Sequence, residues 1–184
     1  LKNALYIIYM NFDKLGWKTL ESYFIDNPYY LTQHHINSYD SFFNKGIFEV
    51  IKEKNPIQIS KNFDERLDDF KFKTELYIGG LDGKSIYFGK PVIYDDRHSH
   101  YMYPNEARLR NMTYAFTIHY DVLVKYNIIN SSSENIEGEL LLPKIYMGRF
   151  PIMLHSNKCV LKHVNRELKF NMGECKNDYG GYFI

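Results

Sequence analysis

Y-A-F-T-I-H-Y-D-V-L-V, the stretch from Tyr114 to Val124, places an aromatic or β-branched residue at every second position. Successive side chains of a β-strand point to opposite faces of a sheet, so this alternation predicts a long strand with one buried face. The run from Phe70 to Ile78 alternates in the same way and predicts a second strand. We expect it to form a hairpin with residues 85–94, because the glycines of stretch 79–83 reach positive φ at low cost.

Helical periodicity dominates the first third of the chain. Apolar residues recur at intervals of three and four over residues 39–51, which predicts a helix with one apolar stripe. An earlier helix is expected over residues 12–25, with Leu15, Leu20 and Phe24 on its inner side. Together these patterns predict an α+β fold in which an amino-terminal helical pair packs on antiparallel sheet. Shorter elements are expected as strands over 140–147, 151–154 and 182–184, and as a short helix or irregular segment over 160–169.

Length and charge limit the classes of function. A chain of 184 residues is long enough for one domain with a proper core, and we expect residues 1–184 to form a single domain. Lys and Arg number 23 and Asp and Glu 22, so the formal charge is only +1 and any nucleic-acid-binding surface must be local. The sequence contains no long apolar run and no secretion signal, which predicts an intracellular protein without a membrane span.

Positive charge is concentrated late in the chain, where residues 140–176 include seven Lys or Arg and two Glu. Contacts between such cations and a phosphate backbone supply affinity without reading the base sequence. An ordinary basic surface is the alternative interpretation of this segment. The residues that we select as nucleic-acid-binding candidates are Arg149, Lys158, Lys162 and Arg166.

Other motifs do not assemble a reactive centre. The segment Gly79 to Ser85, G-G-L-D-G-K-S, misses the spacing of a phosphate-binding loop by one residue and precedes strand-like residues, so we interpret it as a turn. His98 and His100 near carboxylates are more typical of a solvated turn than of a metal site. Cys159 and Cys175 lack a partner pair with metal-ligand spacing, and we expect two buried reduced thiols. We therefore expect no catalytic residue, metal or cofactor in this chain.

Four segments in order carry a resemblance to a known family. They are W-x-x-L-x-x-Y-F at Trp17–Phe24, Y-P-N-E-A-R-L-R-N-M-T-Y at Tyr103–Tyr114, G-R-F-P-I-M-L-H-S at Gly148–Ser156 and D-Y-G-G-Y-F-I at Asp178–Ile184. Their order and approximate spacing resemble the start of the second-largest subunit of multisubunit DNA-directed RNA polymerases. The form E-A-R-L-R-N resembles the eukaryotic, archaeal and large-DNA-virus branches of that family.

The resemblance implies the amino-terminal part of that subunit, in the region called the protrusion, and therefore a fold that is incomplete at its C-terminus. It implies an architectural wall of the DNA cleft within an enzyme that transfers nucleotides, in a fragment that is not catalytic by itself. Mg²⁺ and Zn²⁺ would be bound by parts absent from this chain. Implied partners are the largest subunit, other polymerase subunits, DNA and initiation factors. The implied location is the nucleus, or a cytoplasmic viral factory or virion for a viral protein.

Glu106, Arg108 and Arg110 form the polar centre of the second segment. Two guanidinium groups beside a carboxylate suit phosphate binding. The alternative is structural, because a short helix beginning at Pro104 would place Glu106 four residues before Arg110, where the two can pair. We favour this structural interpretation, which agrees with the scaffolding role that the resemblance implies.

Two further hypotheses remain open at this point. The chain could instead be a stand-alone nucleic-acid-binding or interaction module derived from a split or degenerate polymerase gene. We also expect the isolated fragment to aggregate or to need a partner, because Tyr182, Phe183 and Ile184 would form an unpaired apolar edge.

Overall fold

The computed structural model describes residues 2–66, 68–95, 98–129 and 135–184, with side chains from residue 13 onward. Its helices are α1 (Lys2–Asp26), α2 (Gln33–Ser41), the π-helical turn η1 (Phe42–Gly46), α3 (Ile47–Lys54), α4 (Pro104–Leu109) and α5 (Arg166–Asn171). Its strands are β1 (Ile57–Asp64), β2 (Asp69–Ile78), β3 (Ile86–Phe88), β4 (Val92–Asp95), β5 (His98–Tyr101), β6 (Ala115–Ile129) and β7 (Asn135–Pro151). Helices with antiparallel strands confirm the predicted α+β class.

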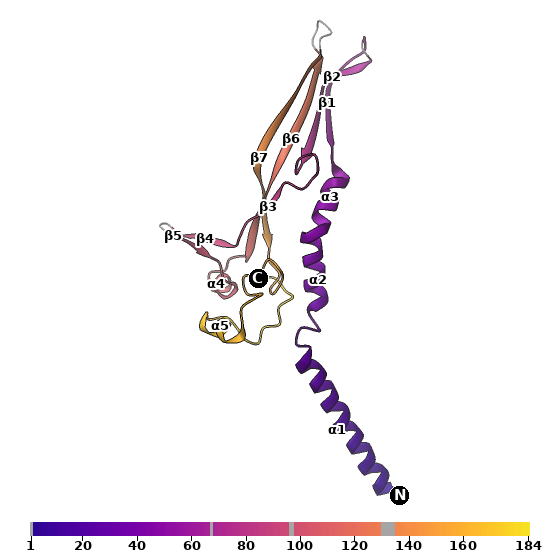
Figure 1. Ribbon diagram of the computed structural model, residues 1–184, viewed down its shortest axis with the longest axis vertical. Helices are drawn as coiled ribbons and strands as arrows, with labels where there is room; N and C mark the ends of the chain where they lie inside the picture. The colour runs from indigo at the N-terminus through magenta and orange to yellow at the C-terminus, as the bar shows by residue number, and fades with distance from the viewer. Residues whose placement is uncertain (1, 67, 96–97, 130–134) are drawn as a thin grey trace.

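The molecule has two main parts (Figure 1). A long sheet extends at the top of the view, and β3, β4, β5, α4, α5 and the C-terminus lie together below it. Helices α2 and α3 run along one side, and α1, coloured indigo, continues away from both parts. We call the first part the arm, with residues 57–64, 69–78, 122–129 and 135–142. We call the second part the body, with residues 33–54, 84–95, 98–121 and 143–184.

Strand β6 is the centre of the fold. It pairs along its whole length with β7, from Ala115 opposite Pro151 to Ile129 opposite Asn135. Its other edge is shared, because β2 pairs with the outer part of β6 and β3 pairs with Ile118–Tyr120. The path β1-β2-β6-β3, with β7 beside β6, forms a five-stranded antiparallel sheet. The alternating run that begins at Tyr114 thus forms the predicted long strand, which joins arm to body.

The expected hairpin between residues 70–78 and 85–94 is wrong. Strand β2 pairs instead with β1 and β6, and the stretch 85–94 divides into β3 and β4. Gly79 and Asp121 explain the change of partner. The Gly79 amide donates to the Asp121 carbonyl at 2.7 Å, and the Asp121 amide donates to the Ser85 carbonyl at 3.1 Å. The glycine turn is therefore held against β6, so β3 continues along the same edge of β6 that β2 has left.

Three smaller expectations can be compared with the structure. Strand β7 is one strand where two were expected, and most of stretch 151–154 lies after its end. Over 160–163 the chain forms turns and the short helix α5 begins at Arg166, which agrees with the expected short helix or irregular segment. The final residues are not assigned to a strand, yet the Ile184 carbonyl accepts from the Tyr114 amide at 3.1 Å. The end of the chain is thus not unpaired, but Tyr182 and Phe183 are 40% and 49% exposed, and the expected aggregation of the isolated fragment stays a prediction.

The core lies in the body, between the helices and the inner half of β6. Phe43, Ile47 and Ile51 are buried along one stripe of η1 and α3, as predicted, whereas Phe42 and Val50 of the same apolar pattern are 45% and 51% exposed. Phe43 packs edge to face against Phe116, with 5.3 Å between ring centroids. Such aromatic pairs add stabilisation beyond the apolar area that they bury. Other members of this cluster are Ile86, Ile93, Met102, Ala107, Tyr114, Ile118, Ile152, Leu154, Cys159 and Leu161.

Helix α1 does not pack as expected. The prediction placed Leu15, Leu20 and Phe24 on an inner face, but their exposed fractions are 62%, 51% and 43%. The helix itself is confirmed and is longer than expected. Its described side chains make no part of the buried cluster, so only the second helical unit packs on the sheet.

The arm has one apolar and one polar face. Strand pairing places Phe72, Leu76, Val124 and Leu140 on the same face, because directly opposed residues share a side of the sheet. The alternate positions, among them Lys73, Glu75, Lys125 and Glu139, form the other face. Many side chains of the apolar face remain exposed, in contrast to the buried cluster of the body.

Candidate functional site

Helix α4 carries the polar block that the sequence singled out. Pro104 is its first residue, a position at which the missing amide costs nothing. Glu106 and Arg110 form an ion pair, with 3.0 Å between Oε1 and Nη2. Arg110 also binds Asp95 at 3.1 Å, and this hydrogen bond raises the pKa of Arg110. Glu106 lies 3.0 Å from His100 Nε2. The expected Glu106–Arg110 pairing is confirmed, and both side chains are engaged within the protein.

Arg108 connects α4 to the C-terminal segment. Its guanidinium hydrogen-bonds the Tyr182 hydroxyl and lies 3.6 Å from Asp178 Oδ2. The Tyr182 hydroxyl in turn donates to the Asp178 carboxylate. Burial acts to raise the pKa of Asp178, but hydrogen bonds from Tyr182 and the Gly180 amide, with the Arg108 charge, hold it below the ordinary value. Arg108 therefore acts as a tie between two distant segments of the chain.

Three of the segments that carry the family resemblance lie against one another. Tyr114 is the common point: its amide donates to the Ile184 carbonyl at 3.1 Å, and its carbonyl accepts from the Ile152 amide at 2.8 Å. The Leu154 amide donates to the Tyr182 carbonyl at 2.9 Å. Tyr114, Ile152 and Leu154 are at most 1% exposed. Residues far apart in the sequence thus form one buried backbone junction.

Two glycines are required at this junction. Gly180 and Gly181 both have positive φ, of 68° and 81°. A Cβ at Gly180 would lie 2.6 Å from the Leu154 carbonyl oxygen, and one at Gly181 would lie 2.8 Å from Thr32 Cβ. Backbone and short side chains cannot move away easily from such contacts. The D-Y-G-G-Y order is therefore explained by packing rather than by ligand binding.

A buried Lys–His pair lies beside this junction. Lys169 is 4% exposed, and its Nζ lies 3.2 Å from His155 Nε2. An ammonium group can only donate, so Nε2 accepts and the imidazole is neutral. Burial, followed by the Lys169 charge, lowers the pKa of His155. Burial likewise lowers the pKa of Lys169. Sequence analysis missed Lys169, because a lysine near a turn gives no sign of burial.

The four basic candidates occupy different surroundings. Lys162 pairs with Asp40 at 3.6 Å, so part of its charge is used within the protein. Lys158 lies 3.8 Å from the centroid of the Phe88 ring, and burial lowers its pKa. Arg149 lies on β7 opposite Thr117 and is exposed, and Arg166 is the exposed first residue of α5. Lys158 and Lys162 thus have neighbours within the protein, whereas Arg149 and Arg166 are exposed to solvent.

A pocket of about 520 Å³ lies between the turn after β3, strand β5 and the loop 157–164. We call it the lysine pocket, because two lysines lie among aromatic residues on its wall. Its lining includes Phe88, Lys90, Tyr101, Tyr103, Lys158 and Met172. Sequence analysis selected Lys158 but missed the others, which come together only through the pairing of β4 with β5 and the path of the 157–164 loop.

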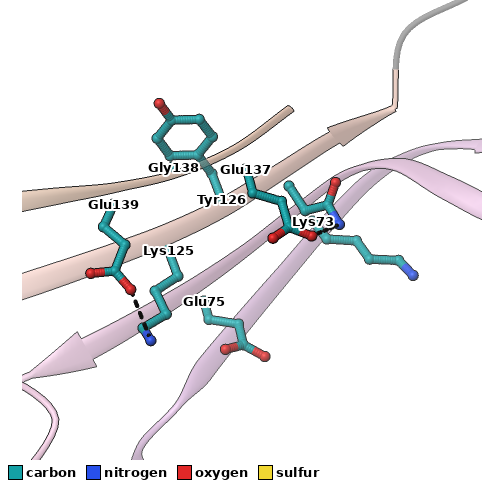
Figure 2. Close-up of a pocket in the computed structure, with 8 residues that line it drawn as sticks. Lys73, Glu75, Lys125, Tyr126, Glu137, Gly138 and Glu139 are labelled. Atoms are coloured by element: carbon teal, nitrogen blue, oxygen red, sulfur yellow. Dashed lines mark hydrogen bonds and ion pairs between the residues drawn. The ribbon is translucent and has the colours of Figure 1, made fainter. Parts of the chain in front are cut away.

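A second pocket, of about 470 Å³, lies on the polar face of the arm. Figure 2 shows Lys125 directed toward Glu139, and the two groups are 3.0 Å apart. Glu75 faces Lys125 across the strands, and Asn127 donates to Glu137 at 3.3 Å. Opposite charges on facing strands stabilise a sheet. Because Lys125 pairs with Glu139, and Lys73 pairs with Asp69 beside the pocket, we interpret this pocket as a structural charge ladder.

The remaining motifs show no assembled chemistry in the described part of the chain. His98 and His100 lie on β5, and no group of three or more His, Cys, Asp or Glu among the described residues could hold a metal ion. The Gly79–Ser85 segment forms a turn that leads into a strand, as interpreted from its spacing. Cys159 and Cys175 are free thiols, but Cys175 is exposed, so its expected burial is wrong. None of the helices in the described ranges is long and apolar enough to cross a membrane.

The fold and the junction at Tyr114 define an α+β protein whose signature segments serve as internal ties. Residues 30–184 match the family model described as RNA polymerase beta subunit. The chain belongs to the RNA polymerase beta subunit family. This is the family that the four sequence segments resembled.

Relatives match nearly the whole chain but are much longer. The chain is 32% identical to DNA-directed RNA polymerase II subunit RPB2 of Eremothecium gossypii, over 92% of this chain and 14% of that protein. It is 31% identical to DNA-directed RNA polymerase subunit Rpo2N of Methanothermobacter thermautotrophicus, over 93% of this chain and 28% of that protein. It is 28% identical to DNA-directed RNA polymerase II subunit 2 of Arabidopsis thaliana, over 92% of this chain and 14% of that protein. The chain thus spans between about one-seventh and just over a quarter of these relatives.

Proposed function

We propose that this chain is the amino-terminal scaffold of the second-largest subunit of a DNA-directed RNA polymerase and forms a wall of the DNA cleft. The observation that carries the proposal is the junction at Tyr114, where three family segments meet inside the matched range. The Glu106, Arg108, Arg110 and Asp178 side chains of these segments form ion pairs and hydrogen bonds within the protein. Such an arrangement suits a rigid support better than a reactive centre.

The chemistry of RNA synthesis would then belong to the rest of the assembled enzyme. That reaction is the attack of an RNA 3′ hydroxyl on a nucleoside triphosphate, organised by metal ions. We place the Mg²⁺ and Zn²⁺ ligands of that enzyme outside this chain. The proposed partners are the largest subunit, the other polymerase subunits, upstream duplex DNA and initiation factors. The proposed location is the nucleus, as the RNA polymerase II relatives suggest, or a viral factory for a viral protein.

Copurification tests this proposal. A tagged copy of the chain, produced in its source cells within its natural gene, should purify with the largest polymerase subunit. The eluate should incorporate labelled nucleotides into RNA on a DNA template. A complex without the largest subunit and without RNA synthesis would overturn the proposal. That outcome would favour the stand-alone module instead. The match of more than 90% of this chain to named polymerase subunits argues against that module.

Contact with DNA is a separate part of the proposal and rests on the exposed cations. Arg149 and Arg166 carry it, with a smaller contribution from Lys162, which already pairs with Asp40. Each phosphate contact that is lost should reduce the slope of log affinity against log salt by about 1. We therefore expect the assembled enzyme with Arg149→Gln and Arg166→Gln to bind upstream DNA with a flatter salt dependence. An unchanged slope would show that these side chains do not contact DNA.

A further inference from the structure

We propose that the lysine pocket binds a peptide segment of a partner protein in which a carboxylate lies next to a bulky apolar side chain. The pocket takes residues from four separate parts of the body: the turn after β3, strand β5, the loop 157–164 and the region after α5. Its volume of about 520 Å³ lies in the range of ligand sites. This inference goes beyond the scaffold role, because it assigns the body a recognition site for protein.

The wall of the pocket is held in place by backbone contacts. The Gly89 amide donates to the Thr117 carbonyl at 2.8 Å, and the Met102 amide donates to the Pro91 carbonyl at 2.9 Å. Any Cβ at Gly89 would lie 2.2 Å from Thr117 Oγ1, so the chain approaches β6 as closely as only glycine allows. The pocket is therefore formed before a ligand arrives, which lowers the entropic cost of binding.

Two cations in the pocket have aromatic neighbours and form no ion pair with a described carboxylate, although Asp40 lies near enough to Lys158 to oppose the effect of burial on its pKa. Lys158 Nζ lies 3.8 Å from the centroid of the Phe88 ring. Lys90 Nζ donates to the Tyr101 hydroxyl at 2.9 Å and lies 5.3 Å from the centroid of that ring. No Asp or Glu is among the described residues that line the pocket, and neither lysine forms an ion pair with a described carboxylate. Elsewhere in the protein Lys71, Lys125 and Lys162 each have one.

Charge and shape together select the ligand. A carboxylate entering between Lys90 and Lys158 would gain charge-assisted hydrogen bonds, which are stronger than neutral ones. The partly buried position of Lys158 strengthens that attraction, because the local dielectric is lower than that of water. Apolar atoms of Val160, Val164 and Met172 complete the lining and offer contact area to an adjacent apolar side chain. An acidic residue beside an aromatic or long aliphatic residue satisfies both requirements.

A nucleic-acid backbone fits less well. Phosphate would suit the two lysines, but duplex DNA presents a convex backbone without an apolar group to fill a concave, aromatic-lined pocket. Lys158 also lies over Phe88 rather than extending into solvent. We therefore favour a protein ligand, and the test below distinguishes it from DNA.

Site-specific photocrosslinking in the purified natural complex tests the proposal. Benzoylphenylalanine replaces Met172 at the rim of the pocket, and mass spectrometry identifies the crosslinked partner and residue. We expect a peptide with Asp or Glu within a few residues of an aromatic or long aliphatic side chain. A crosslink to DNA, a crosslink to a peptide without acidic residues, or no crosslink at all would each overturn the proposal.

Charge dependence gives the decisive control. Adding Lys90→Gln and Lys158→Gln should lower the crosslink yield by about tenfold, as expected for the loss of charged hydrogen bonds. Lys176→Gln is the matched control, because Lys176 also lies near an aromatic ring, Phe170, at 5.6 Å, but lines another pocket. Equal yields from all variants would overturn the proposal. The result is independent of copurification with the largest subunit, since the crosslink can be scored in whatever complex the chain forms.

Discussion

The body and the arm use the same strand in opposite ways. In the body, β6 begins at Ala115, and Tyr114 and Phe116 at this end are 0% and 1% exposed within the buried cluster. In the arm, the same strand continues between β2 and β7, where Phe72 and Leu140 are 39% and 52% exposed. Strand β6 has a paired strand on both edges in both parts, but only the body has a second layer of packing within the described residues. Its stability should therefore depend on side chains much more than that of the arm.

The largest expected effect compares two phenylalanines. Phe116→Ala removes a fully buried ring and should cost about 3–5 kcal/mol of unfolding free energy. Phe72→Ala removes a ring that is 39% exposed and should cost about 1–2 kcal/mol, because less area leaves contact. Pulse proteolysis in increasing urea, performed on the full-length subunit, measures both. Equal losses would show that the apolar face of the arm is covered as completely as the body.

The next effect compares two glycines. Gly180→Ala in the body combines positive φ with a Cβ placed 2.6 Å from a backbone oxygen, and should cost about 2–4 kcal/mol. Gly138→Ala in the arm would place a Cβ against the outer part of the Tyr126 side chain, at its hydroxyl, Cζ and Cε1. Because this single side chain can turn away, the substitution should cost less than about 1 kcal/mol. The urea midpoints of unfolding of the two variants, measured in the same proteolysis assay, compare these two losses of stability. A larger cost at Gly138 would contradict the view that the arm is loosely packed.

The sequence predicted the parts of the fold whose periodicity is local. The stripe of Phe43, Ile47 and Ile51 and the alternation from Tyr114 onward are properties of one element each, and both are confirmed. The pairing of β2 was missed, because a glycine turn permits a hairpin but does not require one. Strand β1 was also missed: in I-Q-I-S-K-N-F-D the alternation is interrupted by Lys61, and the strand is exposed along almost its whole length. Its pairing with β2 depends on contacts that no local pattern encodes.

The candidate sites divide in the same way. The Glu106–Arg110 pair was predictable, because four residues bring side chains together on one face of a helix. The partners of Arg108 lie about 70 residues away in the final segment, with Asp178 among them, so no spacing rule could find them. The lysine pocket likewise joins Lys90 to Lys158 through tertiary structure alone. The predicted basic candidates are a compositional cluster that the fold distributes over different surroundings.

A smaller effect compares two ion pairs. Arg108→Gln removes the contact with Asp178 and the stacking over Tyr182 and should cost about 1–2 kcal/mol, because the partners are partly buried. Lys125→Gln removes the exposed pair with Glu139 in the arm and should cost at most about 0.5–1 kcal/mol. High salt should weaken the second pair further. Thermal shift of the full-length subunit in low and high salt measures the difference. If Arg108→Gln changed the salt dependence of the melting temperature more than Lys125→Gln did, the Arg108 contact would be the more exposed of the two.

The smallest effect concerns mild acid, which should loosen the body before the arm. His155 has a pKa below its ordinary value of 6.5, because it is buried beside Lys169. The unfolded chain therefore binds a proton more readily than the folded chain, and stability is lost as the pH falls below about 6.5. The arm strands contain no histidine. Their Asp64 and Asp69, whose pKa values are lowered by hydrogen bonds from Lys71 and Lys73, lose stability only as the pH falls below 3.8.

Hydrogen exchange measured at two pH values, and corrected for the intrinsic exchange rates, tests whether mild acid affects the body and not the arm. Between pH 7.5 and about 5.5 we expect faster exchange around His155 and unchanged exchange in the arm. His155→Gln should remove this pH dependence. Glu174 acts in the opposite direction, because burial raises its pKa and its stabilising contribution is lost as the pH rises above 4.5. Acidification from pH 7.5 to 5.5 therefore restores part of this contribution. Glu174→Gln removes it and should make the loss of stability caused by His155 larger. A larger increase in exchange on acidification in the arm than in the body would show that the buried Lys–His pair does not set the acid sensitivity of this fold.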